Sequence, residues 1–265
     1  VKDRALSIYD NGYEQVNGVD IPELDERFKP KRGEITVLTG IGNYGKSSFK
    51  KWYQAMRMLL YGEKFASFCP EDNPPEEYYH DIVEILLGCD CTPSNPYRPS
   101  RGVYEYAYDF VCKHVFYVYP KDVTPTPQYV MEVFLELIVK ENVDGVDIDP
   151  FNQLDSMQKS YQREDQYLSM ILKDVKRFAL LNSVCYNIIA HPKNPSYKED
   201  KSLPVADMYD LAGGAMWGNK IDNIISYHRP KFHEDKNSPE VDVWLQKIKR
   251  KRTGGKLGYF QIMLD

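Results

Sequence analysis

Apolar and polar positions along the chain follow two alternating periods, which indicate strands and helices in turn. Short apolar runs predict strands at 34–39, 64–69, 115–119, 145–148 and 184–190. Apolar residues three or four positions apart predict helices at 46–60, from 73 onwards, at 127–139 and around 168–178. In the first of these helices we expect Phe49, Trp52, Met56 and Leu59 to share the buried face. Strands that alternate with helices form a parallel sheet covered on both faces.

The pattern changes from about Ile221, where three further strands at 224–227, 241–246 and 258–264 are separated by turns. The predicted fold is therefore α/β, with a mostly parallel central sheet flanked by helices and with antiparallel C-terminal strands. Residues 1–25 are polar and predict an N-terminal linker or arm, so residues 26–265 form the domain. We expect loops at 194–204 and 231–239.

Composition narrows the class of protein. Apolar residues make up 42% and charged residues 28% of the 265 positions, which excludes collagen-like and disordered chains. No run of about 18 apolar residues exists, so we expect no membrane-spanning segment. The net charge is −5, so binding to nucleic acid requires a local patch, and six basic residues lie within 247–256.

The cysteines and the chain ends give two further expectations. The five cysteines lack a second Cys or His pair at zinc spacing, so we expect reduced thiols in a reducing compartment. The chain begins without Met and stops inside an apolar stretch at 259–264, so we expect a piece of a longer polypeptide.

The strongest local motif is GIGNYGKS at 40–47, which matches G-x-x-x-x-G-K-[ST] between a predicted strand and a predicted helix. Its glycines let the backbone wrap phosphates, and N–H groups at a helix N-terminus favour anions. We expect Lys46 to neutralise the β- and γ-phosphates and Ser47 to ligate Mg²⁺. The predicted nucleotide-binding residues are Gly40, Ile41, Gly42, Asn43, Tyr44, Gly45, Lys46, Ser47 and Ser48.

Polar side chains follow three other predicted strands. Asp149 follows the fourth strand, where a carboxylate can hold Mg²⁺, and Asp147 is either a second polar residue of the site or a sign of a register error. Glu71 follows the second strand and is the predicted general base, with Asp72 as its rival. His191 follows the fifth strand, where a polar group can sense the γ-phosphate by hydrogen bonding.

Together these pieces resemble the RecA-like core of hexameric replicative helicases, most closely of the DnaB and Twinkle type, including phage primase–helicases. Six segments in family order carry the resemblance: GEITVLTGIGNYGKSSF (33–49), FCPEDNP (68–74), DGVDIDPFNQLD (144–155), AHPKNP (190–195), DLAGGAMWGNKIDNIISYHRP (210–230) and KIKRKRTGGKLG (247–258). The resemblance that they carry extends over most of residues 20–265.

The resemblance assigns roles to the matching positions. Lys46 and Ser47 match the Walker A lysine and serine, and Asp149 matches the Walker B aspartate. Glu71 matches the catalytic glutamate, and His191 matches the phosphate-sensing position.

The resemblance also implies an arginine finger, a basic residue that reaches the ATP site of the neighbouring subunit. Aligning the glycines at 255 and 258 makes Arg252 the finger and Arg250 its partner, with Lys249 beside them. An alternative register uses Lys247 and Lys249. We favour Arg252, because a guanidinium group makes fixed bidentate contacts with phosphate. A solvated strand edge, or direct contact with DNA phosphates, is the competing interpretation.

The implied ligands are ATP, Mg²⁺ and single-stranded DNA, and the implied partners are further copies of the chain, as a hexamer in the full-length protein, and primase. The implied location is the cytoplasm of a bacterial or phage-infected bacterial cell. Candidate DNA-binding loops lie at 155–163 and 194–212, with Arg163, Lys193, Lys198 and Lys201 as candidate phosphate contacts and Tyr161 as a candidate for base stacking.

Three other functions use the same phosphate loop. A RecA- or RadA-type recombinase would form filaments, although the segments at 190–195 and 222–230 favour a helicase. A small-molecule kinase would need an arginine-bearing lid, and only Arg163 and Arg177 lie between the fourth and fifth strands. A nucleotide-gated module without hydrolysis is disfavoured by the combination of Lys46, Glu71 and Asp149.

Overall fold

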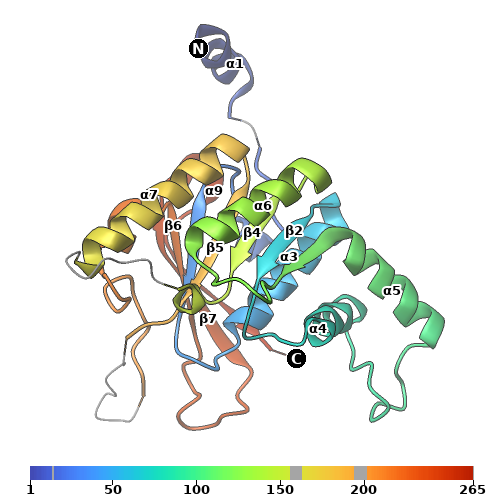
Figure 1. Cartoon of the computed structure of the whole chain (residues 1–265). Helices are drawn as coiled ribbons and strands as arrows, with labels where there is room; N and C mark the ends of the chain where they lie inside the picture. The colour runs from blue at the N-terminus through green and yellow to red at the C-terminus, as the bar shows by residue number, and fades with distance from the viewer. Residues whose placement is uncertain (14, 156–162, 194–201, 265) are drawn as a thin grey trace.

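A computed structural model describes residues 1–13, 15–155, 163–193 and 202–264, which build an eight-stranded sheet with helices on both faces (Figure 1). The strands are β1 (Ile35–Thr39), β2 (Phe65–Phe68), β3 (Val115–Val118), β4 (Gly145–Ile148), β5 (Cys185–Ala190), β6 (Asn223–His228), β7 (Glu240–Ile248) and β8 (Gly258–Met263). Their order across the sheet is β3-β2-β4-β5-β1-β6-β7-β8.

The helices alternate with the strands in the first part of the chain. They are α1 (Lys2–Asn11), α2 (Pro22–Asp25), α3 (Lys46–Tyr61), α4 (Pro75–Leu87), α5 (Arg101–His114), α6 (Pro127–Glu141), α7 (Glu164–Asn182), α8 (Ala215–Lys220) and α9 (Lys251–Gly254), with a 3₁₀ turn at Phe151–Gln153. Glycines in the left-handed conformation end α3 at Gly62 and α4 at Gly88, as the absence of a Cβ allows.

The direction of the strands confirms the expected fold class. Strands β1 to β6 pair in parallel, whereas β7 and β8 extend the sheet in antiparallel fashion beyond β6. A parallel α/β sheet followed by antiparallel strands is therefore confirmed, except that β6, which we grouped with the C-terminal strands, pairs in parallel with β1.

Two layers of helices bury the faces of the sheet. Helices α6 and α7 cover one face (Figure 1). Helix α8 packs against α7, and Phe134, Ile171 and Trp217 of these three helices join the core of β1, β4 and β5. Helices α3, α4 and α5 cover the other face through residues such as Met58 and Ile82. The sheet is therefore apolar on both sides, and its polar chemistry is confined to its edges and to a few buried side chains.

The N-terminal segment divides into two parts. Helix α1 has no buried residue and stands apart from the rest of the chain (Figure 1). Val19 and Leu24, in contrast, are buried in the same cluster as Phe28 and Leu38 of β1. Residues 1–25, which we expected to form an arm as a whole, therefore include a part that packs on the domain.

The structure differs from the prediction at two helices, α5 and α3. Helix α5 was not expected, because its apolar residues are interrupted by exposed tyrosines such as Tyr106. In α3, Leu59 is 55% exposed although we expected it on the buried face. Phe49, Trp52 and Met56 do pack against the core, and α3 also buries polar residues such as Lys50 and Lys51, which form ion pairs. Among the described residues, no helix combines the length and apolar character that crossing a bilayer requires.

Asp222 ties three elements together at the edge where the parallel strands begin. Its carboxylate is fully buried, accepts a hydrogen bond from the backbone N–H of Ile35 at 2.9 Å, and pairs with Lys249 at 2.7 Å and with Lys176. Burial raises the pKa of Asp222, but the hydrogen bonds from Lys176, Lys249 and Ile35 outweigh burial, so the pKa lies below its ordinary value.

The Asp222→Asn substitution should lower the free energy of unfolding by about 2 kcal/mol at pH 7, because it removes hydrogen bonds to a charged group. A lowered folded-state pKa contributes stability above the unfolded value of about 3.9 and loses it as the pH falls through the folded pKa. Urea unfolding should therefore show a large difference between wild type and variant at pH 7 that shrinks towards pH 3. Asp10→Asn in the exposed α1 is the control, and an equal difference at both pH values would contradict this account.

Candidate functional site

Four neighbouring strands of the sheet end at the same edge. The order β2-β4-β5-β1 places them side by side, and the registers pair Phe68 with Ile148, Ile148 with Ile188, and Thr39 with Ala190. The carboxyl ends of parallel strands form the usual ligand-binding edge of an open α/β sheet. The segments that follow these strands, where we predicted the site residues, therefore lie together.

The loop at 40–47 joins β1 to α3 in the geometry that its glycines permit. Gly40 has a φ of 144°, and a Cβ there would lie 2.2 Å from the carbonyl oxygen of Tyr227. Gly45 has a φ of 97° and precedes α3 as a cap that supplies no side-chain hydrogen bond. The first N–H groups of this 16-residue helix therefore have no side-chain cap and can bind an anion.

Lys46 begins α3 and is only 4% exposed. Its ammonium group donates a hydrogen bond of 2.8 Å to the carbonyl oxygen of Ile41, so the loop closes around its own lysine. Burial lowers the pKa of Lys46 to about 8, against the opposing effect of Asp149 and then Glu71. The site therefore holds a partly desolvated cation whose protein partner is a single carbonyl group, which a phosphate oxygen can replace.

Asp149 lies directly after β4 and is buried. Its Oδ2 accepts a hydrogen bond of 2.9 Å from the Nζ of Lys50, which also lies 3.1 Å from the sulfur of Cys69. Burial lowers the pKa of Lys50, but Asp149, Cys69, Tyr78 and Asp147 together hold it well above its ordinary value, so the ammonium group stays charged. Burial raises the pKa of the Cys69 thiol to about 12, and it stays neutral.

Asp147 lies inside the protein, two residues before Asp149 in β4. It accepts hydrogen bonds from Asn187 at 2.9 Å, from Ser67 at 3.1 Å and from Gln54. Burial raises its pKa, and Lys50 opposes this effect. Strand β4 has the predicted bounds, so no register error exists, and Asp147 is a buried polar residue behind the edge.

Glu71 and Asp72 differ in their partners. Glu71 is exposed and accepts a hydrogen bond of 3.0 Å from Gln153, and its charge acts on both Lys46 and His191. Asp72 instead pairs with Lys51 at 3.2 Å. Glu71 is therefore the carboxylate that lacks an ion-pair partner among the described residues, as a general base requires.

His191 follows β5 and completes the edge. Burial lowers its pKa, Lys46 lowers it further, and Glu71 and Asp149 oppose both effects. Its Nδ1 is buried without a hydrogen-bond partner among the described residues, so the imidazole is neutral near pH 7 and has one ring nitrogen available for a ligand.

The residues of this edge fit a nucleotide and a magnesium ion. Besides His191 Nδ1, the hydroxyl oxygens of Thr39 and Tyr227 are buried without a partner in the part of the chain that the structure describes. A Cβ on Gly42 would meet no atom within 4 Å, so the front of the loop is open. Oxygen donors such as the Ser47 hydroxyl and the Asp149 carboxylate are the ligands that Mg²⁺ prefers.

The basic run at 247–256 lies at the opposite edge of the sheet, which is formed by the amino ends of the parallel strands. Ile248 at the end of β7 pairs with Asn223 at the start of β6, which in turn pairs with Thr36 near the start of β1. Lys249 pairs with Asp222 and Arg250 pairs with Glu34 at 3.1 Å. Arg252 donates a hydrogen bond of 3.2 Å to the hydroxyl of Tyr13. A five-residue strand separates these two edges by roughly 13 Å, so the run is remote from the phosphate loop of its own chain.

Much of the predicted DNA-binding surface lies outside the described residues, including Tyr161, Lys198 and Lys201. Arg163 precedes α7 and pairs with Asp165 at 2.8 Å. The backbone N–H of Lys193 donates a hydrogen bond of 2.7 Å to the carbonyl oxygen of Asp210, and Pro192 forms a β-bridge with Leu211.

Comparison with known proteins agrees with this arrangement. The chain is 29% identical to the Twinkle homolog protein, chloroplastic/mitochondrial, of Arabidopsis thaliana, over an alignment that covers 99% of this chain and 37% of that protein. A solved structure described as the ATPase domain of G40P superposes with a TM-score of 0.73 at 17% identity and covers 99% of this chain and 94% of that one. A structure described as a DnaB-like replicative helicase and its interactions with primase gives 0.76 at 17% identity and covers 98% and 64%. No protein-family model matches the chain.

The chain is similar in sequence to a Twinkle homolog and has the fold of two helicase domains. It spans about a third of the length of the Arabidopsis relative. The fold of the two solved structures is thus the fold of this domain.

Sequence reasoning missed the polar residues that this domain buries beneath its phosphate loop. Lys50 and Gln54 follow Lys46 at intervals of four residues, so all three share one face of α3. That spacing is visible in the sequence, and it predicts the burial of Lys50 and Gln54 once Lys46 is placed in the site. Lys51, which pairs with Asp72 and Asp81, was missed as well.

The phosphate loop of the domain should tolerate alanine at one glycine and not at another. Gly40→Ala adds a Cβ against the carbonyl oxygen of Tyr227 at a φ that side chains rarely adopt, so we expect a loss of about 2–3 kcal/mol. Gly42→Ala enters open space and should stay within about 0.5 kcal/mol of the wild type. Urea unfolding measures both variants, and equal stabilities would show that the loop has another conformation.

Proposed function

We propose that this domain is the motor of a replicative DNA helicase, which couples the hydrolysis of Mg·ATP at subunit interfaces to translocation on single-stranded DNA. One observation carries the proposal: the loop at 40–47 converges with Asp149, Glu71 and His191 at one edge of a sheet of the DnaB/Twinkle type. A phosphate cradle, a carboxylate for the metal and a carboxylate free to act as a base are the parts that phosphoryl transfer to water requires.

In this proposal the cis residues divide the work. The N–H groups of the loop and the Lys46 ammonium bind the β- and γ-phosphates, and Lys46 exchanges the carbonyl oxygen of Ile41 for a phosphate oxygen. Ser47 and Asp149 would hold Mg²⁺, which when bound neutralises charge that develops on the phosphate oxygens. Glu71 accepts a proton from the attacking water, and Gln153 orients its carboxylate. His191 hydrogen-bonds the γ-phosphate through a ring nitrogen and reports its presence to the segment after β5.

The basic run supports the trans part of the proposal. It lies at the far edge of the sheet, so its side chains can complete the ATP site of a neighbouring copy and not the site of their own chain. Arg252 is our proposed finger with Arg250 as its partner, and Lys249 with Lys247 is the alternative. Head-to-tail contacts of this kind generate a ring when their rotation closes, and a hexamer is the size that the resemblance implies.

The proposal includes single-stranded DNA as the ligand and primase as a partner. It places the protein in the cytoplasm of a bacterial or phage-infected bacterial cell. The DnaB-like replicative helicase of known structure is described with its interactions with primase, and the name of the Arabidopsis relative places that protein in chloroplasts and mitochondria. DNA held mainly through phosphates should bind more weakly as salt rises. The similarity to a Twinkle homolog and to DnaB-type domains disfavours a recombinase or a kinase, and closed rings in electron micrographs would distinguish the helicase from filaments.

The Lys46→Ala substitution should reduce ATP hydrolysis stimulated by single-stranded DNA by at least about 10²-fold, as the loss of one preorganised donor to a developing charge does. Lys64→Ala, which removes a lysine that pairs with Glu141 outside the site, is the matched control and should keep wild-type turnover. Phosphate release with and without DNA measures both variants. Normal turnover by Lys46→Ala would refute the ATPase proposal.

Mixed assemblies test whether the finger acts in trans. Arg252→Ala and Lys46→Ala chains should each be inactive alone, because one lacks the finger and the other lacks the phosphate-binding lysine. In an equal mixture about a quarter of the interfaces join an intact cis site to an intact finger, so activity should return to about that fraction. Full activity of Arg252→Ala alone, with loss in Lys249→Ala, would move the finger to Lys249.

A further inference from the structure

Helix α3 carries two buried lysines on the turn that follows Lys46. The side chain of Lys50 is 7% exposed and that of Lys51 is 5% exposed. Lys50 contacts Asp149 and Cys69, and Lys51 contacts Asp72 at 3.2 Å and Asp81 at 2.7 Å. The ammonium groups of Lys50 and Lys51 therefore extend from α3 to residues that follow the carboxyl ends of β4 and β2.

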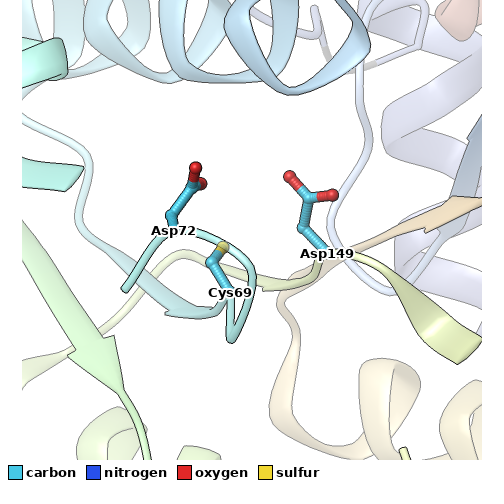
Figure 2. Close-up of side chains that lie close together, drawn as sticks. All are labelled: Cys69, Asp72 and Asp149. Atoms are coloured by element: carbon cyan, nitrogen blue, oxygen red, sulfur yellow. The ribbon is translucent and has the colours of Figure 1, made fainter. Parts of the chain in front are cut away.

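These ammonium groups reach a cluster that a metal ion could otherwise bridge. Cys69, Asp72 and Asp149 each present one ligand atom, and these atoms lie within 4.8 Å of one another. Figure 2 shows the carboxyl groups of Asp72 and Asp149 directed to the same side, with the Cys69 sulfur between them. Lys50 reaches Asp149 and Cys69, and Lys51 reaches Asp72, so the protein itself supplies positive charge to each carboxylate.

We propose that Lys50 is a resident cation that neutralises and orients Asp149 before nucleotide binds, so that the domain captures a divalent ion only together with a nucleotide. This inference rests on the proposed function, because it concerns the same Asp149. Lys50 is a positioning residue in this account, since it acts through Asp149.

Electrostatics gives the reason. A divalent ion on Asp149 alone would lie within a few ångströms of the Lys50 ammonium, and like charges so close repel strongly where water is largely excluded. Lys46, whose pKa Asp149 also influences, adds a second positive charge. The triphosphate brings the negative charge that offsets both lysines, and only then does a divalent ion gain more than it loses.

The geometry distinguishes this role from simple packing. Lys50 occupies one oxygen of Asp149, Oδ2, and holds the carboxylate in a single orientation. The next polar residue on the same face, Gln54, holds Asp147, so the row along α3 fixes both carboxylates of β4. A packing role alone would be fulfilled by any side chain of the right size, whereas the proposed role requires a positive charge.

The test compares Lys50→Gln, which removes the charge and keeps a hydrogen-bond donor, with Lys50→Arg, which keeps the charge. The probe is Mn²⁺ without nucleotide, followed by electron paramagnetic resonance of the free ion. We expect wild type and Lys50→Arg to bind Mn²⁺ weakly and Lys50→Gln to bind it at least tenfold more tightly. Adding Asp149→Asn to Lys50→Gln should abolish the gain.

Lys176→Gln is the matched control, because it removes a positively charged partner of the buried Asp222 at the opposite edge of the sheet. Mn²⁺ binding should not change in this variant. A folded Lys50→Gln with no gain in Mn²⁺ affinity overturns the inference. Tight nucleotide-free Mn²⁺ binding by the wild type overturns it as well, whether or not the variant folds. Binding of a fluorescent ADP analogue with Mg²⁺ distinguishes failure of the proposed function from failure of the inference about Lys50. If the wild type does not bind the analogue, the proposed function is refuted. If the wild type binds it but Lys50→Gln shows no gain in Mn²⁺ affinity, only the role of Lys50 is refuted.

Discussion

The parallel pairing of β2, β4, β5 and β1 is the constraint on which the rest of this domain depends. Because these four strands are neighbours and run in the same direction, the residues that follow them meet at one edge although they are up to 150 residues apart in the chain. Parallel strands need crossover helices, and these helices supply the apolar cover that buries both faces. The polar site is thus a consequence of the sheet order, and the basic run at the other edge is excluded from it by the same geometry.

Charge compensation is the second feature that shapes the site. The face of α3 that meets the sheet carries Lys46, Lys50, Gln54 and Arg57, of which Arg57 pairs with Glu63. Each buried cation has an acidic or carbonyl partner, which is the condition under which charges can be desolvated. Lys46 differs from the others because its partner is one carbonyl oxygen of its own loop. The ion pairs of the other buried cations stabilise this part of the domain. The single contact of Lys46 with a carbonyl oxygen is the one that a ligand can replace.

Much of this domain could be predicted from the sequence, and the exceptions have physical causes. The alternation of short apolar runs and amphipathic segments predicted the parallel sheet. The motif at 40–47 predicted the loop because Gly40 and Gly45 adopt φ angles that other residues rarely reach. The burial of Lys50 could not be predicted from hydrophobicity, since a lysine is usually solvated unless a partner from another strand reaches it. Arg252 stays a prediction, because a run of alternating Lys and Arg offers several registers and a single chain contains only half of a shared site.

The most direct measurement is a structure of the assembled protein with a non-hydrolysable ATP analogue, Mg²⁺ and single-stranded DNA. We predict that the β- and γ-phosphates lie against the N–H groups of the loop at 40–47, that the Lys46 ammonium has left Ile41 for a phosphate oxygen, and that a basic side chain of the 247–252 run of the next subunit approaches the γ-phosphate. A nucleotide bound elsewhere, or bound with Lys46 still on Ile41, would contradict the account.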